Sequence, residues 1–384
     1  MAGVATYGAR GSLGLFVTPW EARFGASRAD IALVSTVGFL VFAAGQTVAG
    51  RIQESVPGRR LVLVGVALCA LGYGGAAFAP SLPAVVLLVG VLAASGIALS
   101  ALPVLSVLAA DLVRSREGMV FGLLTAAGAG GQVVVLPLAA AALNGSERGA
   151  LLVIAGVLGV ALAGVALAVP RGAGVRPEDA APSVPVRGFA RLWREPRFWL
   201  LLVPFFVCGY TTTGLMDTHF IPYAVDHHVP ETVASGALAT LAAFNVLGVL
   251  VAGGLTDRVD RGRLLAILYA GRAGSLLLLP LLTSPRGLFV FAVLFGVVDF
   301  ATVPPTTALT RRVFHTGGWA VALGVISAAH QVGSALGAYL GGWLYDRTGG
   351  YEIVFASAAV ALLAAAAMSL RLAGEQDLAE ARRT

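Results

Sequence analysis

The sequence predicts an all-α membrane protein in which twelve transmembrane helices form two pseudo-symmetric six-helix bundles. Three observations predict this fold class: an extreme composition, regularly spaced apolar runs, and a pattern that occurs once in each half. Hydrophobic residues make up 58% of the 384 residues and charged residues 12%, whereas soluble domains have about 45–50% and about 25%. Because a helix needs about twenty apolar residues to cross a bilayer, this length accommodates twelve spans joined by short loops.

The apolar runs are separated by short segments that hold most of the charged residues. The expected spans are residues 2–20, 29–50, 61–79, 84–110, 119–142, 150–169, 198–224, 232–254, 264–283, 288–309, 318–344 and 351–370. Nineteen arginines follow the even-numbered spans, and five follow the odd-numbered ones. The positive-inside rule therefore places both termini and the central linker in the cytoplasm. We expect a multi-pass protein of a bacterial inner (plasma) membrane.

A polar turn between two apolar runs occurs twice in the same register. Residues 50–60 read GRIQESVPGRR and residues 253–263 read GGLTDRVDRGR, an offset of 203 residues (253 − 50). At this offset Tyr7 also aligns with Tyr210, and Gly11 with Gly214. These matches indicate a duplication in parallel orientation. The expected domains are an N-terminal bundle (1–169), a cytoplasmic linker (170–197), a C-terminal bundle (198–370) and a cytoplasmic tail (371–384). The second part of the linker has the composition of an interfacial helix or of an ordinary basic linker.

Composition also excludes several functions. Every cationic side chain other than histidine is an arginine, so a Walker-type phosphate loop and a lysine Schiff base are excluded. Cys69 and Cys208 lie inside apolar spans, which predicts neither a disulfide framework nor a cysteine metal cluster. The loop arginines form no basic face, and no nucleophile and base pattern occurs. We therefore expect no nucleic-acid partner, no enzymatic activity, no cofactor and no metal. The expected partners are a small-molecule substrate, protons and the lipid bilayer, with the protein a monomer.

Polar residues within the spans are the candidates for function, because an ionised and unpaired side chain at mid-membrane costs at least about 2.5 kcal/mol. They require a partner or a water-filled cavity. The predicted substrate-binding residues are Tyr7, Arg10, Gln132, Tyr210, Asp217, Asn245 and Gln331.

Proton coupling is predicted for Asp299, His330 and Asp217. Asp299 and His330 both lie near the middle of their spans, and a desolvated aspartate can titrate close to the neutral range of histidine. The repeat places Asp217 opposite Arg10, so a pair between the two halves is expected. A structural hydrogen-bonding role for these residues remains the alternative, and a structural role is favoured for Arg272 of span 9.

The twelve spans, the parallel repeat, the long central linker and the two polar turns together resemble the major facilitator superfamily. In that superfamily the turn acts as a conformational latch. The resemblance therefore implies a gating role for Gly50, Glu54, Arg59, Arg60, Gly253, Asp257, Arg258, Arg261 and Arg263. The first copy departs from the family pattern, because Glu54 replaces the customary aspartate and Ser55 stands where an arginine is expected. A turn that only sets membrane topology is the alternative.

Within the superfamily, residues 11–16 (GSLGLF) and 24–28 (FGASR) are similar to the monocarboxylate and oxalate porter branch. Span 8 offers only Asn245 where animal monocarboxylate carriers have an aspartate and an arginine, so their substrate chemistry is not carried over. The resemblance implies a secondary active transporter that works by alternating access, with proton-coupled transport of a small organic anion such as a monocarboxylate. The alternative is a proton-driven efflux antiporter for drugs or metabolites.

Overall fold

The computed structural model describes residues 1–53, 55–101, 104–105, 108, 117–143, 145–173, 192–314 and 319–373. Within these residues every regular element is a helix. Twelve helical regions correspond to the twelve expected spans, and ten of them are long and apolar enough throughout their described residues to cross a membrane. The all-α fold class is therefore confirmed.

The N-terminal half contains the first six regions, of which the first and fourth are interrupted. These are α1 (Ala2–Gly11), 3-10 helix η1 (Leu13–Phe16) and α2 (Val17–Phe24); α3 (Arg28–Ile52); α4 (Gly58–Ala76); α5 (Leu82–Val85), π-helix η2 (Val86–Ala93) and α6 (Ala94–Leu99); α8 (Glu117–Leu143); and α9 (Glu147–Ala168). The first region ends at Phe24, four residues beyond the expected boundary. Ser27 explains the start of the next helix, because its hydroxyl accepts from the Asp30 N–H in a capping box.

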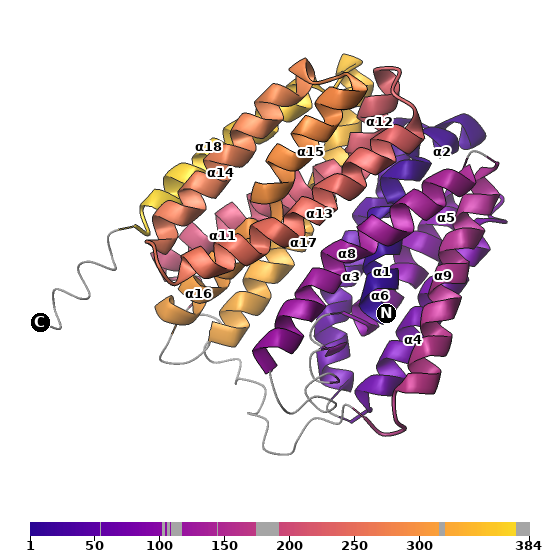
Figure 1. The fold of residues 1–384 in the computed structure, drawn as a ribbon, viewed down its shortest axis with the longest axis horizontal. Coiled ribbons are helices and arrows are strands. Elements are labelled where there is room, and N and C mark those ends of the chain that lie inside the picture. Colours follow the sequence, from indigo (N-terminus) through magenta and orange to yellow (C-terminus); the bar gives the residue numbers. More distant parts are fainter. Residues whose placement is uncertain are drawn as a thin grey trace, which may run out of the picture.

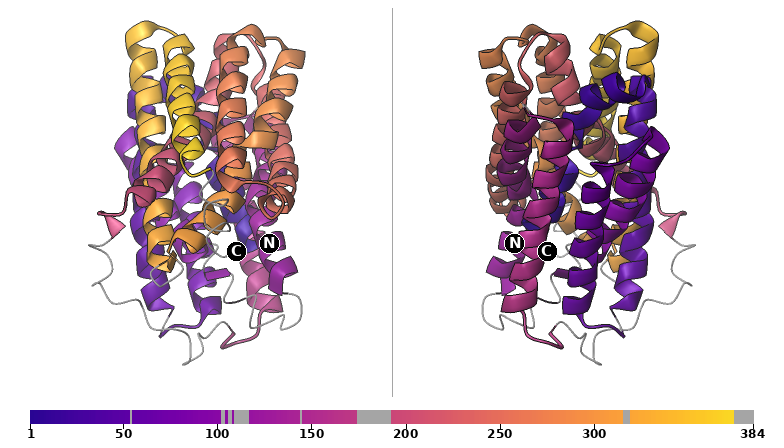
Figure 2. Two further views of the ribbon diagram at one scale, coloured as in Figure 1. Left: turned by 90° about the vertical axis from the view of Figure 1, so that its left-hand side faces the viewer. Right: turned by 90° about the vertical axis from the view of Figure 1, so that its right-hand side faces the viewer.

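The C-terminal half repeats this order, and its first, third and fourth regions contain a 3-10 or π-helical segment. It comprises α11 (Pro196–Gly209), π-helix η4 (Tyr210–Met216) and α12 (Asp217–Asp226); α13 (Glu231–Thr256); α14 (Arg261–Leu278) and η5 (Leu279–Leu281); α15 (Pro285–Asp299), 3-10 helix η6 (Phe300–Thr302) and α16 (Val303–Val313); α17 (Trp319–Thr348); and α18 (Glu352–Leu370). The two halves lie side by side, coloured indigo to magenta and pink to yellow in Figure 1. Figure 2 shows that the long helices run along one common direction. Most of the expected linker and tail lies outside the described residues.

Contacts between the halves are made mainly by three helix pairs, α3 with α17, α8 with α13, and η1 with α12. Glycine allows the closest approaches. A Cβ atom on Gly342 of α17 would lie 2.8 Å from the backbone oxygen of Arg28. The Thr36 hydroxyl of α3 donates to the Ala335 carbonyl of α17 at 3.2 Å. Helices that approach this closely through small residues are typical of packing inside membranes, where apolar side chains alone provide little driving force.

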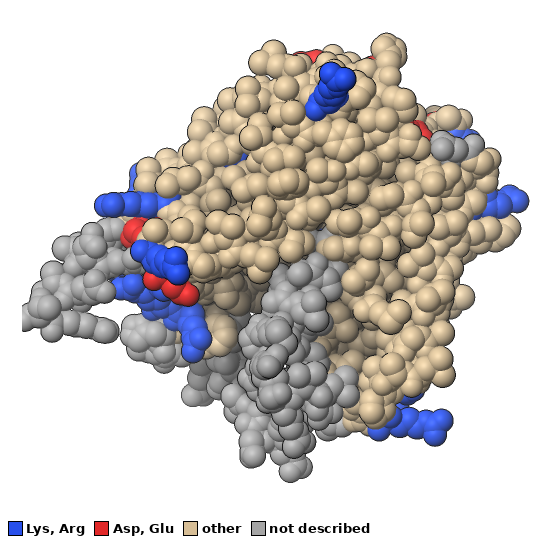
Figure 3. Space-filling view, viewed as in Figure 1, with Lys and Arg blue, Asp and Glu red and all other residues tan. Residues whose placement is uncertain are grey.

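The outside of the molecule is apolar over most of its area. Exposed side chains include Leu71, Val160, Leu167 and Leu281, which are between 64% and 88% accessible. On the face shown in Figure 3, charged residues lie near the ends of the helices and the region between them is uncharged. An apolar surface of this extent needs a lipid environment. The protein is therefore a multi-pass membrane protein.

Candidate functional site

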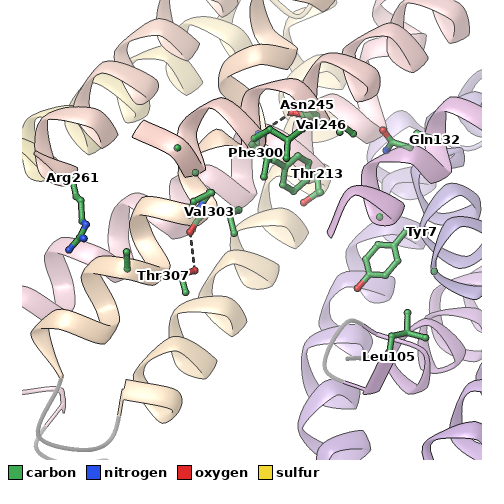
Figure 4. A pocket seen from close by; sticks show the side chains of 18 of the residues that line it. Tyr7, Leu105, Gln132, Thr213, Asn245, Val246, Arg261, Phe300, Val303 and Thr307 are labelled. Atoms are coloured by element: carbon green, nitrogen blue, oxygen red, sulfur yellow. Dashed lines mark hydrogen bonds between the residues drawn. The ribbon is translucent and has the colours of Figure 1, made fainter. Parts of the chain in front are cut away.

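A cavity of about 1100 Å³ lies between the two halves. Tyr7, Arg10 and Gln132 line it from the N-terminal half, and Thr213 and Asn245 are among the residues that line it from the C-terminal half. Figure 4 shows Tyr7 and Gln132 on one side and Thr213 and Asn245 on the other, on ribbons of the two different halves. Four of the predicted substrate-binding residues are thus brought together here, and Asp217 is a fifth.

Arg10 is held in the cavity wall by aromatic rings. Its guanidinium carbon lies 5.4 Å from the ring centroid of Tyr7, 5.4 Å from that of Phe39 and 5.1 Å from that of Phe42. Such cation–π contacts are worth about 0.5–2 kcal/mol each. The Nη1 atom is buried and has no hydrogen-bond partner among the described residues. The rings therefore position the cation without consuming its hydrogen-bonding capacity.

Asp217 is hydrogen-bonded across the two halves. Its Oδ1 atom accepts from Nε2 of Gln132 at 2.9 Å, which links α12 to α8. The side chain of Gln132 reaches this position because Gly11 leaves space for it, and a Cβ there would overlap the amide group. Asp217 also interacts electrostatically with Arg10, although the two form no direct ion pair within the described chain. The amide of Gln132 thus takes the place of the expected contact.

Asn245 joins the cavity to the buried Asp299. Its Nδ2 atom donates to Asp299 Oδ2 at 2.8 Å, and its Oδ1 accepts from the Phe300 N–H at 3.0 Å. Asp299 is only 3% exposed and does not line the cavity. Its other oxygen, Oδ1, is buried with no partner in the described residues. A change at Asp299 would therefore reach the cavity through Asn245.

Arg272 stabilises the helix break beside Asp299. Its Nη2 atom donates to the carbonyl oxygen of Val298 at 2.8 Å and also to that of Asp299, and Nη1 contacts the sulfur of Cys208 at 3.2 Å. The last carbonyls of a helix have no partner within it, and a cation at this end is favourable. Arg272 supplies both the hydrogen-bond donors and the positive charge where α15 ends. These contacts indicate a structural role for Arg272.

The remaining predicted residues lie outside the cavity lining. His330 is 5% exposed, and its ring lies 4.9 Å from that of Phe205. It interacts electrostatically with Arg10, Arg272 and Asp217, and no contact between it and Asp299 is present in the described chain. Tyr210 lies beside Ser357 of α18, and Gln331 has a buried Oε1 without a described partner. Tyr210 and Gln331 are therefore not part of the cavity wall.

Comparison with known proteins gives the family. The sequence profile of the Major Facilitator Superfamily matches residues 1–310 and 220–382. The chain belongs to the major facilitator superfamily. It is 27% identical over 356 residues to the uncharacterized MFS-type transporter YcxA of Bacillus subtilis, covering 90% of this chain and 86% of that one. It is 29% identical over 376 residues to rat (Rattus norvegicus) monocarboxylate transporter 13, covering 95% and 85%.

A solved structure supports the same fold. The crystal structure of a bacterial homologue of the human lysosomal transporter Spinster, in an inward-facing and unoccupied conformation, superposes with a TM-score of 0.73 at 15% identity. The match covers 97% of this chain and 93% of that one. Membership in the superfamily makes the protein a membrane transporter and not an enzyme.

One copy of the superfamily's polar turn lies at the end of the cavity. Gly253, Asp257 and Arg261 contribute to the lining there, together with Arg311 and Arg312 of α16. Within the described chain, no hydrogen bond or ion pair joins Asp257 to the N-terminal half. Among the described residues, Asp257 therefore does not form the latch that the resemblance implies.

The other turn residues serve local structure or remain exposed. Arg59 donates to the carbonyls of Val169 and Ala166 at 2.7 and 2.9 Å, which ties α4 to the end of α9. Arg261 donates to the Thr256 carbonyl at 3.0 Å. The exposed members are Arg60, Arg258 and Arg263, Gly50 is half-buried, and Glu54 lies outside the described residues.

Sequence reasoning missed Phe39 and Phe42, because apolar residues inside an apolar span carry no compositional signal. Phe39 and Phe42 are three residues apart, which places both on one face of α3. This spacing is the sequence feature that is consistent with their shared contact with Arg10.

Proposed function

We propose that this protein is a proton-coupled transporter of a small organic anion, such as a monocarboxylate, working by alternating access. The observation that carries the proposal is the state of Arg10. A cation in the wall of a central cavity, framed by rings and with a buried unpaired nitrogen, is suited to bind a carboxylate through a charge-assisted hydrogen bond. The name of rat monocarboxylate transporter 13 supports the same substrate class.

Charge balance explains why a proton would accompany the anion. When Asp217 is ionised, its charge and that of Arg10 nearly cancel, and a bound carboxylate would add a second negative charge near one cation. Like charges at a shared site disfavour ionisation. A proton on Asp217 removes the repulsion, and the bond from Gln132 to Oδ1 survives if the proton sits on the other oxygen. His330 and Asp299 are the further groups proposed to take part in proton movement.

The side of the membrane on which the cavity opens is proposed from the positions of the arginines. The lining extends to Gly253, Asp257, Arg261, Arg311 and Arg312, at the end that carries the arginine-rich loops. Since such loops are retained in the cytoplasm, this conformation is inward-facing, with both termini on the cytoplasmic side of an inner membrane. In the outward-facing state the polar turns would contact the opposite half.

A second candidate function, proton-driven efflux of a drug or metabolite, is favoured by the apolar part of the cavity. Val246, Leu250 and Val303 belong to its lining, and together with a volume of about 1100 Å³ they would accommodate a substrate larger than lactate. Apolar walls with a few polar groups are common to sites for drug-sized molecules.

Uptake into proteoliposomes separates the two candidates. We expect labelled lactate, pyruvate or a longer monocarboxylate to accumulate under an inward proton gradient. Oxalate should accumulate less, because Arg10 is the one arginine of the described lining that does not belong to the arginine-rich end with Arg261, Arg311 and Arg312. If none of these anions accumulates while an opposed proton gradient drives loss of an apolar cation, the efflux candidate replaces the first.

A further inference from the structure

Arg28 joins the two halves at the end of the molecule opposite the arginine-rich loops, which we call the outer end. It is the first residue of α3 and is 5% exposed. Its Nε and Nη2 atoms donate to the carboxylate of Glu21 at 2.8 and 3.1 Å. Its Nη1 and Nη2 atoms donate to the carboxylate of Asp226 at 2.6 and 3.3 Å. Glu21 belongs to the same half, and Asp226 ends α12 in the other half.

Two tyrosines of the C-terminal half complete the surroundings of this guanidinium. Its central carbon lies 3.8 Å from the ring centroid of Tyr345, a distance typical of stacking between arginine and an aromatic face. The Tyr351 hydroxyl accepts from Nη1 at 3.2 Å and lies 3.0 Å from Nδ1 of His219. The Nε2 atom of that histidine is 2.7 Å from the Ala338 carbonyl. Arg28 is thus bonded into a buried network that belongs to the opposite bundle.

A second link across the halves lies within the same turn of α3. The carboxylate of Asp346, near the end of α17, accepts from the backbone N–H groups of Arg28 and Ala29 at 3.1 and 2.9 Å. These N–H groups have no partner within their own helix, and a negative charge at a helix N-terminus is favourable. Gly342, one turn earlier on α17, allows the backbones to touch here. The helix start of one half is therefore capped by the other half.

We propose that this cluster is an outer gate, which closes the transport path at its outer end and whose bonds across the halves must break before the cavity can open there. The members of the outer gate are Glu21, Arg28, Asp226, Tyr345, Asp346 and Tyr351. The cavity reaches the opposite end of the bundle, so the outer gate and the latch at the polar turns would close alternately. This inference needs two conformations and does not depend on which substrate is carried.

The arrangement of carboxylates makes the outer gate reversible. Separation of the halves removes Asp226 and Asp346 from α3, but Glu21 stays with Arg28 because both belong to the N-terminal half. The guanidinium therefore keeps one ionic partner in the open state, and the two aspartates become accessible to water. The buried charge is never left unpaired, which would carry a large penalty.

Spin labels at the outer end test the proposal. We would introduce Ala22→Cys on α2 and Thr232→Cys on α13, both exposed, and measure the distance distribution between the labels by double electron–electron resonance. Cys69 and Cys208 are buried and leave the introduced sites as the reactive ones. In the full-length protein we expect Arg28→Gln to raise the ratio of the longer-distance to the shorter-distance population at least about fivefold, the lower end of typical coupling between states.

Two further variants keep the test decisive. Asp226→Asn removes only the partner in the opposite half and leaves the pair between Arg28 and Glu21, so it should shift the ratio in the same direction even if Arg28→Gln does not fold. Arg23→Gln is the matched control, because Arg23 also pairs with a glutamate at this end, Glu147 at 2.8 Å, but within one half. The outer gate is refuted if Arg28→Gln and Asp226→Asn leave the distribution unchanged, or if Arg23→Gln shifts it as much as they do.

Discussion

Replacing Arg10 with glutamine removes the charge and the buried Nη1 donor from the cavity wall while keeping a polar side chain of similar reach. That nitrogen has no described hydrogen-bond partner, so a bound carboxylate would supply its first. A hydrogen bond to a charged group contributes about 1.5–3 kcal/mol, which corresponds to an increase of about 10- to 150-fold in the apparent KM for the anion. Arg10→Lys keeps the charge without the planar donor group, and the increase should be below about tenfold.

The assay is concentration-dependent uptake of a labelled monocarboxylate into proteoliposomes, with equal amounts of reconstituted protein checked by thermal unfolding. Arg148→Gln is a suitable control. Arg148 is also an arginine with an aromatic contact, 5.0 Å from the ring centroid of Phe78, and it lies outside the cavity lining. An Arg10→Gln protein that folds and shows a KM within twofold of the unsubstituted value would refute the assignment of Arg10 as the anion site.

Three further outcomes are expected. Asp217→Asn keeps a hydrogen-bonding group beside Gln132 but cannot titrate. Net uptake should therefore lose its dependence on the proton gradient, while exchange of labelled for unlabelled substrate persists. Uptake that still follows the gradient would show that Asp217 does not take part in the coupling step. Arg272→Met leaves the carbonyls at the end of α15 without donors. We expect the free energy of unfolding in detergent to fall by about 2–5 kcal/mol. An unchanged free energy of unfolding would contradict the capping role of Arg272. Gly131→Ala places a Cβ 2.6 Å from the Gly8 nitrogen and should lower the free energy of unfolding by about 1–3 kcal/mol. The Cβ of Gly128→Ala, on the same helix, meets nothing within 4 Å, so the free energy of unfolding should change by less than about 0.5 kcal/mol. Equal losses in the two variants would contradict this expectation.

The fold was accessible from the sequence because a bilayer leaves few options for an apolar chain. The period of spans and loops, together with the repeat of Gly50 at Gly253, was enough to predict twelve helical regions and their family. Details within the spans were not accessible. The π-helical segments 86–93 and 210–216 contain no sequence feature that separates them from ordinary helix, because their hydrogen-bond register depends on the helices packed around them.

The candidate site was predictable only where a polar residue interrupts an apolar span. That signal led to Arg10, Gln132, Asp217 and Asn245, which the fold brings to one cavity. It gave no information on which groups meet, and the pairing of Asp299 with Asn245 depends on how α13 and α15 cross. The contacts of Arg28 were also hidden, since its partners lie 198 and 318 residues away and charged residues at span ends are ordinary in membrane proteins.

The interruption of the tenth span at Phe300–Thr302 has a consequence for how the protein moves. Pro304 and Pro305 lie in the first turn of the following helix, α16, and lack the N–H groups that would bond it to the preceding turn. Val303, Thr307 and Arg311 all line the cavity. They therefore lie on an eleven-residue helix, α16, which packs against α11, α13, α14 and α17 but is separated from α15 by the break that Arg272 stabilises. A small change of angle at this break would therefore move one wall of the cavity relative to α15 without breaking a backbone hydrogen bond between the two helices.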